Sequence, residues 1–168
     1  MQKLRKQAEV VGLNQNRTFT VDISCHEYCE PRAEYDLDGY TIYVYSPEML
    51  VCEKLRAICQ QMPQYRRSVE GGAARPRAND FFDIWCLTRH FRLELADQRN
   101  RDLCRRMFDA KRVPLSLLQH IADFREFHRQ GFRIVEDTVK PGVILKPFDY
   151  YFDYVLKLVN GLHALWVE

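Results

Sequence analysis

Residues 38–59 read DGYTIYVYSPEMLVCEKLRAIC, and this stretch decides the fold. Asp38-Gly39 is a hairpin-type turn signal, and the β-branched and aromatic run 40–45 after it is typical of a strand. Residues 46–48 then begin a helix, with a capping serine, a proline at the first helical position and an early acid. The sequence therefore predicts that the chain changes there from β-structure to helix.

Upstream of this stretch the pattern also indicates β-structure. Residues 18–24 alternate and are rich in β-branched side chains, so we expect a pair or more of antiparallel strands within 17–45. A short amphipathic helix is predicted over 2–12. Asp36-Leu37-Asp38 runs directly into the hairpin glycine, and we interpret it as turn chemistry.

Downstream of residue 46 the apolar spacing is helical. We expect helices near 46–62, 79–91, 114–130 and 148–166, with a loop over 63–78 and a charge-rich, peripheral segment over 93–106. The predicted fold class is α+β, a small antiparallel sheet in 1–45 followed by a mainly α-helical bundle in 46–168. We expect the two parts to form one compact unit.

The composition excludes several classes of protein. The 168 residues include 25 basic and 23 acidic side chains, a formal charge of +2, which is too balanced for diffuse attraction to nucleic acid or membrane. No run approaches the roughly 18 apolar residues of a membrane span. The first residues lack the apolar segment of a secretory signal, so we expect a cytoplasmic protein with no membrane partner.

The six cysteines are predicted to be reduced thiols, because several of them lie among apolar neighbours. Cys25, His26 and Cys29 form one metal-like group. Their spacing is unusual, and no second Cys/His pair completes a tetrahedral set. We therefore predict no structural zinc at this group.

Two charged residues stand out on the predicted helices. Asp80 projects with Ile84, Leu87 and Phe91 on an apolar face. Such a carboxylate is either functional or a first-turn acid that the helix N-terminus stabilises. Lys54 lies at the margin of the preceding helix's apolar stripe, where it either extends to solvent or reaches an anionic ligand held between the helices.

Arginines gather around the predicted loop over 63–78. They are Arg56, just upstream on the helix, and Arg66, Arg67, Arg75 and Arg77. A solvated surface loop and a loop that binds a polyanion both fit this pattern.

Two spaced motifs and the basic loop between them occur together in this chain. The first is YSPEMLVCEKLRA at 45–57, and the second is RPRANDFFDIW at 75–85. Over roughly residues 17–92 the chain resembles the AbiEii/AbiGii toxin family. In that family a glutamate-lysine-leucine-x-alanine helix is followed by an arginine and then an aspartate-x-x-aspartate-isoleucine/leucine helix.

The resemblance implies a function. The family belongs to the polymerase-β-like nucleotidyltransferase superfamily, and its members are typically toxins of abortive-infection or toxin–antitoxin systems, which act in phage defence. By this resemblance Lys54 would be catalytic and contact the triphosphate of an NTP, and Asp80 would be the essential late aspartate. Asp83 would be a supporting acid, and Arg75, Arg77 and Asp83 would also bind the nucleotide.

The superfamily also uses a metal-binding carboxylate on a strand flanked by hydrophobic residues, and Val21-Asp22-Ile23 stands where that strand is expected. The resemblance therefore implies that Asp22 is catalytic and binds the Mg²⁺ or Mn²⁺ that accompanies the NTP. Phosphoryl-type transfer needs two divalent ions held by carboxylates, and Asp22 supplies only one carboxylate. Residues 1–45 would be the remnant of a nucleotidyltransferase core.

The family pattern also has a Gly-Ser turn and an Asp-x-Asp pair upstream of that strand, but no Gly-Ser dipeptide occurs in this sequence. The chain would then be an N-terminally truncated gene or a degenerate homologue. We expect a nucleotidyltransferase that moves a nucleotide from an NTP to an RNA or protein acceptor, inactive as this chain alone, with an antitoxin protein as partner. The alternative is a non-catalytic nucleotide-, RNA- or protein-binding module, in which Asp22 and Asp80 are structural acids.

Overall fold

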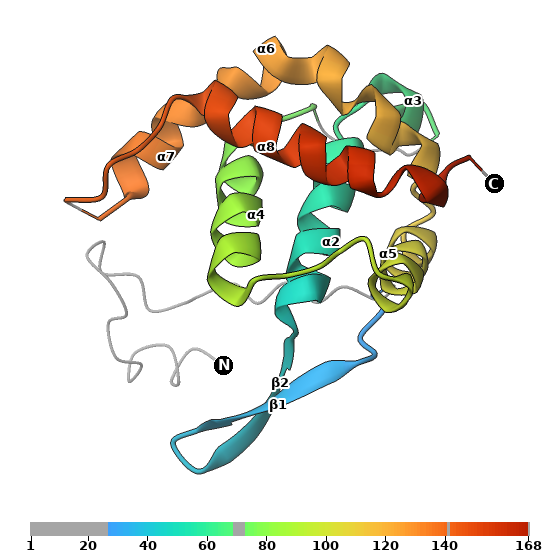
Figure 1. The fold of residues 1–168 in the computed structure, drawn as a ribbon, viewed down its shortest axis with the longest axis vertical. Helices are drawn as coiled ribbons and strands as arrows, with labels where there is room; N and C mark the ends of the chain where they lie inside the picture. Colours follow the sequence, from blue (N-terminus) through green and yellow to red (C-terminus); the bar gives the residue numbers. More distant parts are fainter. Residues whose placement is uncertain (1–26, 69–72, 141, 168) are drawn as a thin grey trace, which may run out of the picture.

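The computed structural model describes residues 27–68, 73–140 and 142–167. A two-stranded antiparallel hairpin of β1 (Arg32–Leu37) and β2 (Tyr40–Tyr45) leads into a body of helices, so the α+β class is confirmed (Figure 1). The helices are α2 (Pro47–Cys59), α3 (Pro63–Arg66), α4 (Ala78–Phe91), α5 (Gln98–Ala110), α6 (Arg125–Arg129), α7 (Phe132–Thr138) and α8 (Phe148–Gly161), with 3-10 segments η1 (Leu115–Phe124) and η2 (His163–Leu165). The helix predicted over 2–12, the strand over 18–24 and Asp22 lie outside the described residues.

The hairpin turn has the expected chemistry. Asp38 and Gly39 have φ values of 53° and 85°, the left-handed pair that a two-residue hairpin turn requires. The Asp36 carboxylate accepts a hydrogen bond from the Gly39 N–H at 3.3 Å. The interpretation of Asp36-Leu37-Asp38 as part of a turn is therefore confirmed.

Helix α2 begins as its sequence predicts and forms the centre of the bundle. The Ser46 hydroxyl accepts a hydrogen bond from the Met49 N–H at 3.3 Å, and Pro47 occupies the first turn. The helix lies between α4 and α5 (Figure 1). Its side chains that are completely buried include Met49, Val51, Leu55, Ile58 and Cys59.

Helix α4 is buried between α2 and α8. The ring of Phe81 stacks on that of Phe152 in α8, with centroids 4.9 Å apart. Asp80, Phe81, Ile84 and Thr88 are among the buried residues of α4. Phe91, which the sequence placed on the same face, is 50% exposed, because it is the last residue of the helix and lies beyond the cover of its neighbours.

The sequence predicted that the segment 93–106 is peripheral, and this prediction is wrong. Helix α5 packs against α2 and buries Leu103, Cys104, Met107 and Phe108. The apolar pattern was weak because the predicted segment stopped at residue 106, before the last two of these side chains. Burial at i, i+1, i+4 and i+5 is the stripe of an ordinary amphipathic helix.

Three other predicted elements differ in detail from the structure. The helix expected over 114–130 is a 3-10 segment, η1, followed by the short α6, because the apolar spacing of such a segment fits both helical periods. The helix over 148–166 ends at Gly161 and is followed by η2. The loop over 63–78 contains the short α3.

The cysteines of the described residues are free thiols, as predicted. Cys52, Cys59 and Cys104 are buried, and burial raises the pKa of the Cys59 thiol well above its usual range. Cys29 is exposed, so it is not a core thiol. Cys25 and His26 lie outside the described residues. No helix in the described part of the chain is both long and apolar enough to span a bilayer.

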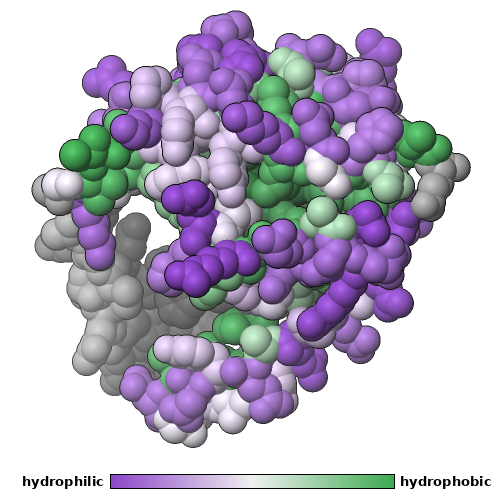
Figure 2. Space-filling view, viewed as in Figure 1, coloured by the Kyte–Doolittle hydropathy of each residue, from purple (hydrophilic) through white to green (hydrophobic). Residues whose placement is uncertain are grey.

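Exposed large hydrophobic side chains gather in two regions of the described structure. The hairpin exposes Tyr35, Leu37, Tyr40, Tyr43 and Val44, whereas α7 and the loop after it expose Ile134, Val143 and Ile144. Figure 2 shows mainly hydrophilic side chains over the helical body, with hydrophobic surface at the edge where α7 lies. The second region borders the candidate site described next.

Candidate functional site

Four charged side chains from α2, α4 and the residue before α4 meet at one place. Lys54 Nζ lies 2.6 Å from an Asp83 oxygen and 3.3 Å from an Asp80 oxygen. The other Asp80 oxygen accepts a hydrogen bond from Arg77 Nε at 2.6 Å. We call Lys54, Arg77, Asp80 and Asp83 the charged cluster.

The geometry of α4 places both carboxylates toward α2. Asp80 and Asp83 are three residues apart, which puts them on neighbouring positions of one helix face. Asp80 is in the first turn of α4, where the helix N-terminus favours a negative charge. Asp80 therefore lies in the first turn, which either a structural or a functional role allows. Lys54 is paired with two carboxylates of the protein, and its contact with an anionic ligand between the helices stays a prediction.

The four side chains of the charged cluster differ in how far they are exposed to solvent. The Asp80 side chain is 8% exposed, whereas those of Asp83 and Arg77 are 43% and 39% exposed. Lys54 is intermediate at 22%. The buried carboxylate therefore holds two cations, and the more exposed groups are the ones that can exchange partners with a ligand.

Lys54 is a fixed cation in this arrangement. Burial alone would lower the pKa of its ammonium group, but the hydrogen bond to Asp83 and the negative charge of Asp80 outweigh burial and raise that pKa. A lysine that stays protonated binds phosphate oxygens as a point charge and does not serve as a general base.

A buried histidine supports the backbone of Arg77. His128, at the end of the short α6, is 0% exposed, and its Nδ1 accepts a hydrogen bond from the Arg77 N–H at 3.1 Å. This contact requires a neutral ring with its proton on Nε2. Burial and then the charge of Arg77 lower the pKa of His128 to about 4, so the ring is neutral at physiological pH.

Gly131 brings the turn before α7 close to the same backbone. A Cβ atom on Gly131 would lie 2.8 Å from the Cβ of Pro76, the residue before Arg77. The sequence analysis did not identify His128 or Gly131. Ile121, Phe124 and His128 are spaced as on one face of a helix. This spacing places the histidine on an apolar face, and it is the sequence signal that could have identified His128.

Two arginines near the predicted loop, Arg75 and Arg56, do not join the cluster. The Arg75 side chain is exposed, and its backbone N–H donates to the Gln61 side chain at 3.0 Å. Arg56 is not a free cation near the loop, because it is buried and paired with Glu53 one turn earlier on α2. Asp22 lies outside the described residues, so its predicted position in a shared cleft stays a prediction.

The described residues do not fit a divalent-metal site by themselves. Both carboxylates of the cluster already face an ammonium or a guanidinium group. Within the described ranges no three His, Cys, Asp or Glu side chains are grouped so that they could hold a metal ion. The expectation of Mg²⁺ or Mn²⁺ therefore depends on Asp22, and we derive no step through a metal.

A pocket of about 260 Å³ opens beside the charged cluster. Arg77, Asp80 and Asp83 line one side of it, and Gly131 and Ile134 line the other. It is too small for a whole nucleotide, but it adjoins a larger groove between α4 and α7, with which it shares Asn79 and Asp83. The cluster is thus reachable from the surface.

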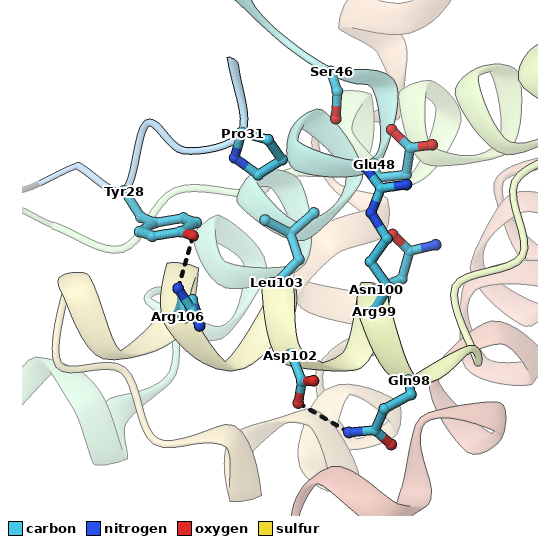
Figure 3. A pocket seen from close by; sticks show the side chains of 10 residues that line it. All are labelled: Tyr28, Pro31, Ser46, Glu48, Gln98, Arg99, Asn100, Asp102, Leu103 and Arg106. Carbon is cyan, nitrogen blue, oxygen red and sulfur yellow. Dashed lines mark hydrogen bonds between the residues drawn. The ribbon is translucent and has the colours of Figure 1, made fainter. Parts of the chain in front are cut away.

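A separate cavity of about 460 Å³ lies between the start of α2 and α5 (Figure 3). Arg99 and Arg106 face it together with Glu48 and Asp102, and Arg106 donates a hydrogen bond to the Tyr28 hydroxyl at 3.2 Å. Its positive and negative side chains balance, so it offers a polyanion no net attraction. No residue of the charged cluster lines it.

The fold brings the two sequence motifs together. A β-hairpin leads into a helix whose lysine meets the paired aspartates of the next long helix. The family model described as "Nucleotidyl transferase AbiEii toxin, Type IV TA system" matches residues 3–154. The chain belongs to this family, as its two motifs predicted. No curated protein and no solved structure matches the chain.

Proposed function

We propose that this protein is a nucleotidyltransferase of the toxin–antitoxin type, a class whose reaction is transfer of a nucleotide from an NTP to an RNA or protein acceptor, and that this chain alone binds the NTP but does not transfer it efficiently. Lys54 and Arg77 bind the triphosphate, and Asp80 holds both cations in place. One observation carries the proposal: Lys54 and the Arg77–Asp80–Asp83 segment, from the two family motifs, meet in a single cluster. An antitoxin partner and a role in abortive infection are part of the proposal, because the family belongs to toxin–antitoxin systems.

The cluster suggests how a triphosphate is accepted. Asp83 is the more exposed of the two carboxylates, so its carboxylate exchanges with a phosphate oxygen at Lys54 at the lower desolvation cost. Asp80 remains bound to Arg77 and keeps the two cations on one side of the ligand. Charge-assisted hydrogen bonds from ammonium and guanidinium groups are the usual means of holding phosphate.

A second candidate, a non-catalytic nucleotide-, RNA- or protein-binding module, rests on a different observation. Lys54 and Arg77 are both neutralised by carboxylates of the same cluster, as in a structural ion-pair network. In that case the cluster joins α2 to α4, and the basic side chains outside it bind a partner. The two candidates differ in whether loss of Lys54 changes nucleotide affinity.

Calorimetric titration with ATP, GTP, CTP and UTP tests the proposal. We expect weak binding by the wild-type chain and a loss of about ten- to a hundred-fold in affinity for Lys54→Ala, the range for losing a charge-assisted contact. Lys157→Ala is the matched control, because it removes an exposed lysine of α8, far along the chain from both motifs. Equal affinities of all three proteins for every NTP would refute the role of Lys54 and favour the binding module.

A further inference from the structure

The groove between α4 and α7 has a volume of about 460 Å³. Phe82 and Trp85 of α4 form one side of it, and Val135, Val139 and Val143 form the other. We call it the α4–α7 groove. Its volume lies in the range of small-molecule pockets, and its walls are mainly apolar, as in such pockets.

The α4–α7 groove continues into the pocket beside the charged cluster. Asn79 and Asp83 line both spaces, so these residues mark the junction between them. At one end a ligand meets Arg77, Asp80 and Asp83, with Lys54 behind the two carboxylates, and at the other end it meets aromatic and aliphatic side chains. A ligand that fits both spaces therefore has an anionic part and a flat, weakly polar part.

The aromatic side of the groove is rigid. The ring centroids of Phe82 and Trp85 are 6.3 Å apart, and both rings pack edge-to-face against Tyr151, a fully buried residue of α8. A fixed aromatic and aliphatic wall suits a nucleobase, because base–aromatic stacking tolerates any base. Asn79, an exposed amide at the junction, can donate to and accept from a ribose or a base edge.

We propose that the α4–α7 groove is the nucleoside subsite of this protein, in which the base lies between the Phe82–Trp85 side and the valines of the α7 side. The triphosphate then extends past Asn79 to the charged cluster. This assignment rests on the proposed function, because it requires an NTP at the cluster. It adds the location of the base, whose polar neighbours in the groove are Asn79, Asp83, Thr138 and Lys140. Stacking on the apolar walls holds any base, so we expect the four NTPs to bind with similar affinity.

Two adjacent exposed residues give a matched test of the subsite. Val143 lines the groove and is 53% exposed, whereas Ile144 does not line it and is 86% exposed. Val143→Asp and Ile144→Asp change the charge equally, and neither removes a buried side chain. Trp166→Phe in each protein leaves Trp85 as the only tryptophan, so that its fluorescence reports on the groove.

The probes are the four NTPs and inorganic tripolyphosphate. We expect each NTP to change Trp85 fluorescence and to bind about ten-fold more weakly to Val143→Asp than to Ile144→Asp, because an apolar contact with the base is replaced by a carboxylate that must be desolvated beside it. Tripolyphosphate should bind the two variants equally and leave the fluorescence unchanged.

Three outcomes would overturn the assignment, and they are distinguishable. If NTPs and tripolyphosphate bind with equal affinity and both variants behave alike, the triphosphate site exists but the base lies elsewhere. If neither NTP nor tripolyphosphate binds the wild-type chain, the proposed function fails, and the nucleoside subsite fails with it. Binding of NTPs that Lys54→Ala leaves unchanged would likewise reject the cluster as the triphosphate site.

Discussion

Asp80 shows how a buried charge is tolerated in this protein. Its side chain is 8% exposed, and an isolated carboxylate at such a place would be strongly destabilising. Lys54, Arg77 and the N-terminus of α4 together compensate its charge. Removing either cation leaves a buried carboxylate with only part of its compensation, so the residues of the charged cluster contribute to folding as well as to any ligand site.

His128 should make the stability of the protein depend on pH. The unfolded histidine binds a proton near its ordinary pKa of 6.5, whereas the folded ring stays neutral until the pH falls to about 4. The unfolded state therefore binds more protons in this window, so the free energy of unfolding is largest above it and falls as the pH is lowered. We expect a loss of about 2 kcal/mol from this residue between pH 7 and pH 5.

Urea denaturation of two variants at both pH values checks this expectation. His128→Asn does not titrate, but its side-chain oxygen can still accept from the Arg77 N–H, so this variant should lose less stability at pH 7 than His128→Phe. Both variants should lack the part of the pH dependence that His128 contributes. An unchanged pH dependence in both would show that the folded histidine is protonated normally.

Gly131 is required by close packing against Pro76. An added Cβ would lie 2.8 Å from the Pro76 Cβ, so Gly131→Ala should lower the free energy of unfolding by about 1–3 kcal/mol, the usual cost of overpacking. Gly161 in α8 has open space around the same position, and Gly161→Ala should be neutral or stabilising. Chemical denaturation of both variants measures the difference, which would vanish if the turn before α7 moved freely.

At the scale of the elements, α6 and α8 are joined by a second ion-pair group. Arg125 and Arg129 contact Asp149, and Arg125 also contacts Asp153 at 2.6 Å. The two guanidinium groups lower the pKa of Asp149 to about 2. These side chains are partly exposed, so we expect only a modest contribution to stability. They hold α6, and with it His128, against α8.

Helix α2 carries Lys54, and the contribution of its N-terminal cap, Ser46, to stability can be measured. Ser46→Ala removes the acceptor for the Met49 N–H and should lower the free energy of unfolding by about 1 kcal/mol. Ser46→Asp keeps an acceptor and places a negative charge at the helix N-terminus, so its stability should equal or exceed that of the wild type. Thermal and urea denaturation of the two variants compare them, and equal destabilisation would show that the cap is not used.

At the scale of the whole molecule, α2 separates two different spaces. The charged cluster and the α4–α7 groove lie on its α4 side, and the charge-balanced cavity lies on its α5 side (Figure 3). The hairpin extends from the body, and most of its large hydrophobic side chains are exposed in the described structure (Figure 1). The helical body therefore holds the triphosphate and base sites that we propose, and the hairpin contributes no residue to them.

We expect the 168-residue chain to transfer little or no nucleotide, although it binds NTPs. Two-ion catalysis needs several shared carboxylates, and both acids of the charged cluster are paired with cations. Incubation with labelled NTP, Mg²⁺ or Mn²⁺, and RNA measures transfer directly, and Lys54→Ala sets the background. Robust transfer of label by the wild-type chain would show that metal ligands come from residues outside the charged cluster and contradict this expectation.

The sequence by itself determined the local features of this protein. The turn at Asp38 and Gly39, the start of α2 at Ser46 and the first-turn position of Asp80 follow from backbone preferences and capping, which act within a few residues. The two motifs likewise identified the family. The extent of α5 and the 3-10 conformation of η1 were missed, because apolar spacing alone fixes neither the ends of a helix nor its exact period.

Only the tertiary structure decided which of these residues meet. Lys54 and Asp80 are 26 positions apart in the chain, and Arg77 and His128 are 51 apart, so their contacts depend on how the helices pack. Arg75, two residues from Arg77, does not join the cluster, because its side chain is exposed while Arg77 is turned toward Asp80. Periodicity predicts the face on which a side chain lies, but the partner it finds there depends on the angle and register of the neighbouring helix.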